Sequence, residues 1–398
     1  MIILKDPLYG FISLEEPFKS LIETKQFQRL RNIKQLGQSY LIYPSANHTR
    51  FEHSIGTFYL AQRIAEKIVA EDKLAFGKND SRRNEFLAAA LLHDIGHYPF
   101  SHSIEKAIGS ANGATHEEQA IKIIHTTEIG KILKKAEMDP GIICDLIKGK
   151  GKFGGLIAGQ IDADRLDYLK RDSYYTGVAY GVIETDVIIK NLTVDGRKYF
   201  IDEKFLPAFE SILISRYLMY SMVYMHRKTL IANSMLQAAF YEALAAGEID
   251  PDQLTEFDDI DFISVLRRSK TAAKDLINRI SNRKLYGEAI IFRKEDLADG
   301  LDNIKKIKDT LEIEKNIARD LKIKNHEILI NILKIPKFSE SEIFVNPTGQ
   351  ELEKISPFVK ALGLAEWNHW FIGIYCPKDQ IEKVKKAKNQ IKRYLLGE

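Results

Sequence analysis

The stretch LLHDIGHYPFSH, residues 91–102, holds three histidines and one aspartate and lies at the end of a strongly apolar run. Neighbouring side chains on a helix point about 100° apart, so His93 and Asp94 can approach one point only at a helix end or a kink. Gly96 and Pro99 both interrupt helices and provide such an end. The stretch therefore predicts a buried helix that ends in a metal or phosphate site.

Histidine is concentrated in one part of the chain. Seven of the ten histidines fall between residues 48 and 125. Metal sites and acid–base sites combine histidine with aspartate, so this clustering favours one of them. Thr49 and Glu52 match a capping box, which places His53 near the start of a long amphipathic helix. Taken alone, His53 is better explained as a partly buried histidine with satisfied hydrogen bonds.

A second dense group of charged side chains occurs in IDADRLDYLKRD, residues 161–172. If this segment is helical, its acidic positions recur every three or four residues along one face. Its four carboxylates are more than its two arginines and one lysine need for pairing. Intrahelical ion pairs such as Asp167–Arg171 are the alternative explanation, and the residues alone do not identify the aspartate that would bind a metal.

The composition is typical of a soluble globular protein, with 45% hydrophobic and 28% charged residues. The net charge of +3 gives no general case for nucleic-acid binding. Cys144 and Cys376 lie far apart without metal-binding spacing, and they indicate a reducing compartment. No apolar run approaches the roughly 18–20 residues of a membrane span, and the first residues do not resemble a signal peptide. We therefore expect a cytoplasmic protein that does not associate with membranes.

A chain of 398 residues is long for one compact core, so we expect one large domain with an appendage. Residues 1–250 are expected to be mainly helical with a small β-hairpin at 192–201, and Asp250-Pro251 marks the boundary. Residues 251–398 alternate strands with helices, which predicts an α+β appendage. The expected helices are 17–34, 49–69, 81–92, one beginning at 115, 204–246, 295–321 and 378–396. The expected appendage strands are 289–292, 328–331, 343–345 and 371–375, and turns or extended segments are expected at 6–10 and 40–44.

Two lysine-rich segments, residues 131–152 and 383–388, are the basic stretches of the chain. An exposed, solvated helix face explains both segments, and a phosphate-facing patch is the less favoured alternative. They motivate the hypothesis of a non-catalytic protein that binds nucleotides or nucleic acid.

Five segments of the chain form a recognisable series. They are ETKQFQRLRNIKQLG (23–37), TRFEHS (49–54), LHDIGHYPFSH (92–102), THEE (115–118) and IDADRLDYLKRD (161–172). In this order they resemble the HD-domain metal-dependent phosphohydrolases, and most closely the dNTP triphosphohydrolases of that class, the group that holds the sterile-alpha-motif/HD-domain enzyme and its prokaryotic relatives. The resemblance spans about residues 5–235 and implies an HD-domain helical core whose residues 49–172 carry the metal site.

The resemblance implies that His53, His93, Asp94 and Asp164 bind one divalent metal ion. Two imidazoles and two carboxylates suit Mn²⁺, Mg²⁺, Fe²⁺, Ni²⁺ or Zn²⁺. In octahedral geometry, four protein ligands leave two positions for a phosphate oxygen and a water.

The resemblance also assigns the remaining site residues. The implied catalytic residues, which contact phosphate oxygens or move protons, are Arg50, His97, His102, Glu105 and His116. The implied substrate-binding residues are Gln35, Leu36, Arg50, Arg165, Tyr168 and Asp172, of which Gln35, Leu36, Tyr168 and Asp172 would hold the deoxyribose.

The implied reaction converts a dNTP and water into a deoxynucleoside and tripolyphosphate. Many members of this family are tetramers, so the resemblance implies a homo-oligomer, either a dimer or a tetramer. The resemblance places a GTP or dGTP activator site at Glu23, Gln28 and Arg31. The alternatives are another HD phosphohydrolase, acting on GTP, nucleoside monophosphates or cyclic nucleotides, and the non-catalytic binding protein.

Overall fold

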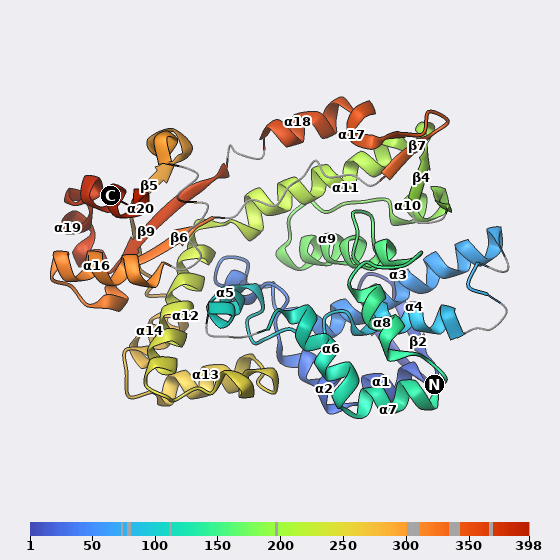
Figure 1. Cartoon of the computed structure of the whole chain (residues 1–398), viewed down its shortest axis with the longest axis horizontal. Coiled ribbons are helices and arrows are strands. Elements are labelled where there is room, and N and C mark those ends of the chain that lie inside the picture. The colour runs from blue at the N-terminus through green and yellow to red at the C-terminus, as the bar shows by residue number, and fades with distance from the viewer. Residues whose placement is uncertain are drawn as a thin grey trace.

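The computed structural model describes residues 1–72, 75–77, 81–110, 114–195, 198–300, 304, 310–333, 343–365 and 369–397. Helices dominate, and the described residues form three small sheets, so the expected mainly helical class is confirmed (Figure 1). In the part of the chain that is described, no helix combines the length and the apolar character needed to cross a membrane.

Three packed helices form the centre of the molecule: α3 (Arg50–Glu71), α4 (Ser81–Leu92) and α9 (Ala163–Thr176). Helix α3 packs against both of the others. It begins as expected, with a capping box in which the Thr49 side chain accepts a hydrogen bond from the Glu52 amide. The second half of α4 is buried on every side, which explains its continuous apolar sequence.

Four shorter helices flank this centre. The expected helix start at residue 115 is confirmed, because Thr115 and Glu118 form a second capping box. The flanking helices are α5 (His102–Ser110), α6 (His116–Thr126), α7 (Glu128–Lys135) and α8 (Pro140–Ile147).

The N-terminal region differs from the expected single helix over 17–34. Thr24 accepts a hydrogen bond from the Phe27 amide and thereby starts a new helix, so the segment divides into short pieces. Of the two alternatives expected for residues 40–44, the turn is present: the 3-10 helix over residues 37–41 leads into turns at residues 42 and 44. The elements are β1 (Ile2–Asp6), β2 (Gly10–Leu14), α1 (Phe18–Ile22), α2 (Lys25–Gln28), η1 (Arg29–Asn32) and η2 (Gly37–Leu41).

The expected hairpin near residue 192 is confirmed, with β3 (Leu192–Asp195) antiparallel to β4 (Lys198–Asp202), although Gly196 of its turn lies outside the described residues. The expected continuous helix over 204–246 is interrupted by a π-helical turn and by His226, whose ring accepts a hydrogen bond from the Lys228 amide. The elements around it are η3 (Gly154–Leu156), α10 (Thr185–Asn191), η4 (Glu203–Phe205), α11 (Leu206–Met219), η5 (Tyr220–Tyr224) and α12 (Arg227–Ala245).

All four expected strands of the C-terminal third are present. Strand β9 lies between β5 and β6 in an antiparallel sheet, whereas β7 pairs in parallel with β4 in the sheet β3-β4-β7-β8. In Figure 1 the two sheets lie on opposite sides of the view, so the C-terminal third returns to the helical core. The strands are β5 (Gly287–Arg293), β6 (Leu329–Ile332), β7 (Ile343–Asn346), β8 (Gln350–Glu351) and β9 (Phe371–Cys376).

The helices of this third pack on different neighbours: α19 packs against β5 and α17 against β7, whereas α14 packs against α12 and α13. Residues 301–303 and 305–309 of the expected helix over 295–321 lie outside the described residues. The helices are η6 (Pro251–Thr255), α13 (Asp259–Arg268), α14 (Ala273–Ser281), η7 (Lys294–Gly300), α16 (Leu311–Leu321), η8 (Asn325–Glu327), α17 (Leu352–Ile355), α18 (Pro357–Ala365), η10 (Lys378–Gln380), α19 (Ile381–Lys386) and α20 (Lys388–Leu396).

Packing is continuous across residue 250. One cluster of buried side chains joins Phe100 of the central region with Phe240 of α12 and Phe262 of α13. The division of the chain at residue 250 stays a prediction.

Candidate metal centre

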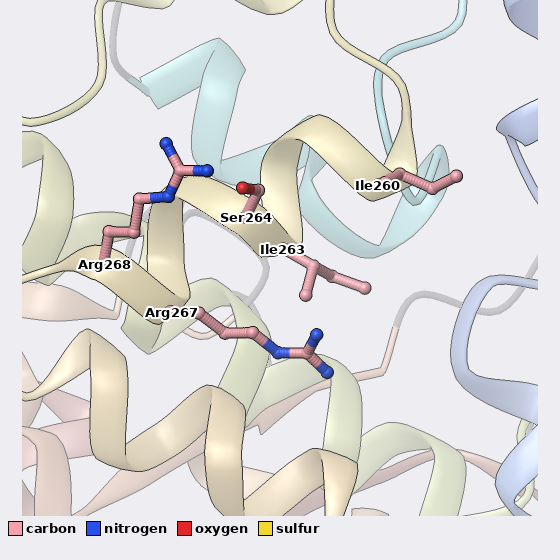
Figure 2. Close-up of a pocket in the computed structure, with 5 residues that line it drawn as sticks. All are labelled: Ile260, Ile263, Ser264, Arg267 and Arg268. Atoms are coloured by element: carbon pink, nitrogen blue, oxygen red, sulfur yellow. The ribbon is translucent and has the colours of Figure 1, made fainter.

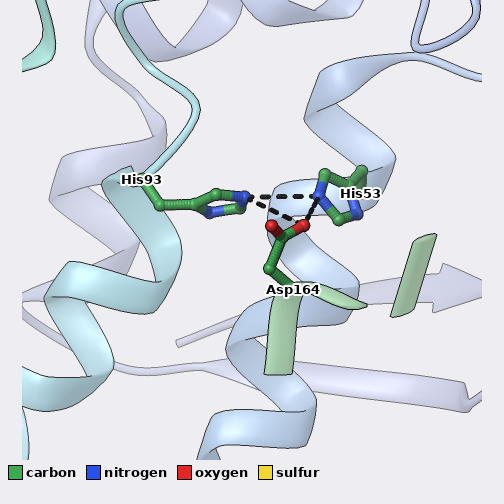
Figure 3. Close-up of side chains that lie close together, drawn as sticks. All are labelled: His53, His93 and Asp164. Atoms are coloured by element: carbon green, nitrogen blue, oxygen red, sulfur yellow. Dashed lines mark hydrogen bonds and ion pairs between the residues drawn. The ribbon is translucent and has the colours of Figure 1, made fainter. Parts of the chain in front are cut away.

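Two histidines and one aspartate from three separate segments of the chain meet at one point (Figure 3). His53 lies in the first turn of α3, His93 directly follows α4, and Asp164 lies in the first turn of α9. His53 Nε2 is 2.8 Å from Asp164 Oδ1, and His93 Nε2 is 3.2 Å from His53 Nε2 and 3.6 Å from Asp164 Oδ1. One atom of each residue therefore lies within 4.8 Å of the others, which is a spacing that could hold a metal ion.

The far side of each imidazole is fixed by a hydrogen bond. His53 Nδ1 is 2.7 Å from Asp167 Oδ2, and His93 Nδ1 is 2.9 Å from the carbonyl oxygen of Ala90. Metal-binding histidines commonly donate their second ring nitrogen in this way, which orients the ring and selects the tautomer. Both Nε2 atoms are thus directed at the shared point.

The charge of the cluster also suits a cation. Burial lowers the pKa of His53, but its hydrogen bonds with Asp164 and Asp167 outweigh burial and raise that pKa to about 10. A buried imidazole that is held so strongly in its charged form lies in an environment rich in negative charge. Imidazole nitrogens combined with a carboxylate are donors that borderline divalent ions accept, so the residues fit such an ion.

Asp94 lies beside the three-residue cluster. Its Oδ1 is 3.4 Å from His93 Nε2, and its Oδ2 is 3.7 Å from His53 Nε2. Arg50 Nη1 donates to Asp94 Oδ2 at 2.6 Å, and His97 Nε2 is 3.0 Å from Oδ1. Burial alone would raise the pKa of Asp94, but Arg50, His93 and His97 hold that pKa well below its usual range. The Asp94 carboxylate thus lies beside the imidazoles of His53 and His93 and also accepts a hydrogen bond from Arg50.

The loop after Asp94 is held by groups that sequence reasoning missed. Arg29 donates to the carbonyl oxygens of Ile95 and His97 at 3.0 and 2.8 Å. Phe100 and Ser101 adopt left-handed backbone conformations, with φ of 54° and 46°, which non-glycine residues rarely adopt without support. That support comes from outside the loop, because the Phe100 amide donates to Asp259 and Arg50 Nε donates to Ser101 Oγ, both at 2.7 Å.

A histidine–glutamate pair borders the Asp94 side of the centre. His116 Nδ1 is 2.5 Å from Glu105 Oε1, and the His116 ring stacks on His97 with 4.2 Å between centroids. Burial lowers the pKa of His116, but the hydrogen bond with Glu105 outweighs burial and raises it. By contrast, burial and the nearby Arg50 cation lower the pKa of His97 well below its usual value. The backbone of His102 begins α5, and its side chain lies outside the described residues.

The expected sugar-binding residues lie along α9 and the segment before η2. Both oxygens of Asp172 are engaged, by His48 Nε2 at 2.7 Å and by the Tyr224 hydroxyl at 2.6 Å. Gln35 is held next to His48, because the backbone N–H of Gln35 donates to the His48 carbonyl oxygen at 3.0 Å. Sequence reasoning missed His48 and Tyr224, although His48 belongs to the histidine-rich part of the chain.

The other substrate residues are partly buried. Arg165 Nη1 donates to the carbonyl oxygen of Gln160 at 2.7 Å, and its Nε is buried and makes no hydrogen bond within the described part of the chain. Leu36 and Tyr168 are half-buried and pack against the main core.

The expected activator residues are only partly brought together. Arg31 Nε donates to Gln28 Oε1 at 2.8 Å, and Gln28 Nε2 donates to the Ile22 carbonyl oxygen at 2.7 Å. The Arg31 guanidinium lies 3.6 Å from the centroid of the Phe51 ring. Glu23 directly follows α1, and its Oε1 lies 3.9 Å from Lys19 Nζ.

A surface pocket of about 410 Å³ lies on α13 (Figure 2). It contains none of the site residues expected from the sequence. The side chains that line it are Ile260, Ile263, Ser264, Arg267 and Arg268.

Comparisons with known proteins match both parts of the chain. A family model for the HD domain matches residues 50–172, and a model for an HD associated region matches residues 183–393. The chain is 36% identical over 99% of its length to an uncharacterized protein of Methanocaldococcus jannaschii, of which 84% is covered. It is 30% identical over 71% of its length to a deoxynucleoside triphosphate triphosphohydrolase SAMHD1 homolog of Dictyostelium discoideum, of which 59% is covered.

Solved structures extend the similarity to the whole fold. A hypothetical protein from Aquifex aeolicus has a TM-score of 0.76 at 29% identity, covering 97% of this chain and 99% of that one. A phosphohydrolase from Bacteroides thetaiotaomicron has a TM-score of 0.75 at 26% identity, covering 95% and 100%.

Proposed function

The chain belongs to the HD-domain phosphohydrolase family, and on this premise we propose that it is a metal-dependent dNTP triphosphohydrolase. The proposed reaction cleaves the bond between the 5′ oxygen and the α-phosphorus of a dNTP, releasing a deoxynucleoside and tripolyphosphate. The convergence of His53, His93 and Asp164 carries the proposal. The similarity to the Dictyostelium enzyme favours dNTPs among phosphorylated substrates.

The metal would be held by His53, His93 and Asp164, with Asp94 as the fourth ligand. The mixed nitrogen and oxygen donors favour Mn²⁺, Fe²⁺, Ni²⁺ or Zn²⁺, while Mg²⁺ is better suited to oxygen ligands alone. A bound divalent ion supplies Lewis acidity, which polarises a phosphoryl oxygen and lowers the pKa of a coordinated water.

The leaving 5′ oxygen needs a proton, and His116 is placed to donate it. Glu105 fixes one ring nitrogen, so the other nitrogen of a charged His116 can face the substrate. Glu105 also favours the charged form, which is the form that acts as an acid. His97 would remain a neutral contact to a phosphate oxygen, because its pKa is lowered.

The triphosphate requires positive charge around the centre. Arg50 is fixed by Asp94 and Ser101, so its charge is held in place before substrate binds. Arg165 directly follows Asp164, and its buried Nε, for which the described residues supply no hydrogen-bond partner, supports a role in phosphate binding. His102 is proposed as a further phosphate contact on the basis of the resemblance alone.

The deoxyribose would lie between Gln35, Leu36, Tyr168 and Asp172. Because both Asp172 oxygens already accept hydrogen bonds, we infer that Asp172 acts partly by holding Tyr224 in place. A close fit at this position would exclude the 2′-hydroxyl of a ribonucleotide.

Activation by GTP or dGTP at Glu23, Gln28 and Arg31, and assembly into a dimer or tetramer, are part of the proposal. The mutual contact of Gln28 and Arg31 supports a shared binding surface. A cytoplasmic location is proposed from the composition.

The decisive experiment offers each dNTP and NTP with Mn²⁺ or Mg²⁺, with and without GTP or dGTP, and follows free tripolyphosphate. We expect deoxynucleoside and tripolyphosphate in equal amounts from dNTPs. The variant Asp94→Ala should lose both metal binding and turnover, while Asp145→Ala, at an exposed position, should keep both.

Other products would redirect the proposal. Orthophosphate from GTP or nucleoside monophosphates, or linear nucleotides from cyclic ones, would identify another HD phosphohydrolase. Tight, salt-sensitive binding of single strands without turnover would identify a nucleic-acid-binding protein.

A further inference from the structure

A fully buried arginine lies between the N-terminal hairpin and the metal centre. Arg171 of α9 has no exposed surface. Its Nε and Nη2 donate to the two oxygens of Asp167 at 2.8 and 2.9 Å, and its Nη1 is 2.9 Å from Asp6 Oδ2. A buried charge is strongly unfavourable unless it is paired, so both carboxylates are needed to hold Arg171 in place.

The same contacts reach a proposed metal ligand. Asp167 Oδ2, which accepts from Arg171, is also 2.7 Å from His53 Nδ1. Asp6, Arg171, Asp167 and His53 therefore form one unbroken series, and each side chain is at most 5% exposed. Water does not screen interactions in such a series, so a change at one end is transmitted to the other.

Helix α3 is shaped to admit this pair. A Cβ atom at Gly56 would lie 2.0 Å from Asp167 Oδ1 and 2.3 Å from Arg171 Nη2. Glycine is unfavourable inside a helix, and here it leaves the space that the two charged side chains occupy.

Asp6 uses its two oxygens differently. Oδ1 accepts the amides of Leu8 and Tyr9 at 2.8 and 3.1 Å and so forms the hairpin turn. Oδ2 faces Arg171. The turn is also anchored to α3, because the Tyr9 ring stacks on Tyr59 with 4.8 Å between centroids.

We propose that Asp6 is a positioning residue of the metal centre, acting through Arg171 and Asp167 to fix the ring of His53. The inference rests on the metal centre of the proposed function. It makes the N-terminal hairpin part of the outer support of a site whose first ligand lies in α3.

Two substitutions separate the charge of Asp6 from its role in the turn. Asp6→Asn keeps an oxygen that can accept the turn amides but loses the charge that faces Arg171. Asp6→Glu keeps the charge, while its longer side chain cannot form the same turn. Binding of Mn²⁺ to the full chain, measured by calorimetry or by the Mn²⁺ electron spin resonance signal, reports the effect without relying on turnover.

We expect Asp6→Asn to weaken Mn²⁺ binding about 3- to 10-fold, below the roughly 10- to 100-fold loss typical of residues that touch a ligand directly. Asp6→Glu should bind Mn²⁺ more tightly than Asp6→Asn. Asp186→Asn is the matched control, because it breaks the exposed ion pair of Asp186 with Arg63 on α3 and should leave Mn²⁺ binding unchanged.

Unchanged Mn²⁺ affinity in a folded Asp6→Asn protein would overturn the inference, as would an equal or larger loss in Asp6→Glu. If Asp6→Asn does not fold, Gly56→Ala is the substitute, because its Cβ displaces the Asp167–Arg171 pair from the side of α3. Normal Mn²⁺ affinity in Gly56→Ala would overturn the inference. Failure of the unmodified chain to bind any divalent ion would instead overturn the metal centre, and this inference with it.

Discussion

Gly96 and His116 meet through their backbones, since a Cβ atom at Gly96 would lie 2.0 Å from the His116 carbonyl oxygen. The loop that carries His93 and Asp94 therefore touches the first turn of α6 without an intervening side chain. The distance between the metal-binding residues and the proposed acid is set by this contact.

Replacing Gly96 with alanine should push the loop and α6 apart. We expect a loss of about 1–3 kcal/mol in the free energy of unfolding, measured with urea, and lower turnover. Gly141→Ala is the control, because the nearest atom to its Cβ would be Asp139 Oδ1 at 3.2 Å. That change should cost less than Gly96→Ala, because Asp139 is an exposed side chain that can shift, and an equal loss of stability in the two variants would contradict the close contact.

Asp167→Asn should weaken metal binding, because the amide no longer accepts a charge-assisted hydrogen bond from His53 Nδ1. Residues in this position typically contribute 10- to 100-fold to affinity, so we expect roughly that loss in a Mn²⁺ titration. The exposed variant Asp145→Asn should bind normally. Normal affinity in Asp167→Asn would show that His53 is oriented by other contacts.

Glu105→Gln should alter the pH dependence of turnover. Glu105 raises the pKa of His116, so the charged acid persists to higher pH in the unmodified chain. Without that carboxylate the pKa falls, and the decline of turnover with rising pH should move to lower pH. A rate loss of about 10²- to 10⁴-fold is typical when acid catalysis is removed, and the loss here should not exceed that range.

The control is Glu117→Gln, at an exposed position that directly follows His116 in the first turn of α6. Its profile of turnover against pH should match that of the unmodified chain. If Glu105→Gln lowers turnover by the same factor at every pH, so that the decline of turnover stays at the same pH, His116 is not the proton donor.

Asp259 should make stability depend on pH. Burial raises its pKa to about 6, although the amides of Lys34 and Phe100 donate to it and act in the opposite direction. The folded chain therefore holds a proton that the unfolded chain releases near its ordinary value of 3.8. The contribution of this group to the free energy of unfolding is present at low pH and is lost as pH rises from about 4 to about 6.

The measurement compares the unmodified chain with Asp259→Asn by urea unfolding at several pH values. The stability of the unmodified chain relative to the variant should fall as pH rises from about 4 to about 6. Asp252→Asn, at an exposed position, should show no such trend. A difference that is constant with pH would mean that Asp259 is ionised throughout that range.

Local patterns predicted much of the fold. The capping box forms where Thr49 and Glu52 indicated, a helix begins where residue 115 was expected to start one, and the four appendage strands are present. Other features of the fold were not predicted from the sequence. Nothing in residues 343–346 identifies β4 as their partner, and the π-helical turn after α11 interrupts an otherwise helical pattern. The N-terminal strands were missed, although Ile12 and Leu14 alternate with exposed residues.

The candidate site was predictable in part. The residues themselves indicated a site at His93 and Asp94, and the family resemblance selected Asp164 over the other aspartates of its segment. The structure brings His53, His93 and Asp164 together, and their binding roles stay predictions. The supporting contacts could not be predicted, because Arg29 and Asp259 reach the loop from segments far away in sequence.

The parallel pairing of β4 with β7 has a consequence for how the chain is made. Ribosomes release β4 long before residue 343, so the β4 edge of the β3–β4 hairpin stays unpaired while more than a hundred residues are added. Pairings of such high contact order form slowly, and open strand edges recruit other chains. A chain shortened after residue 333 would keep its metal-binding residues and yet be prone to aggregate through β4.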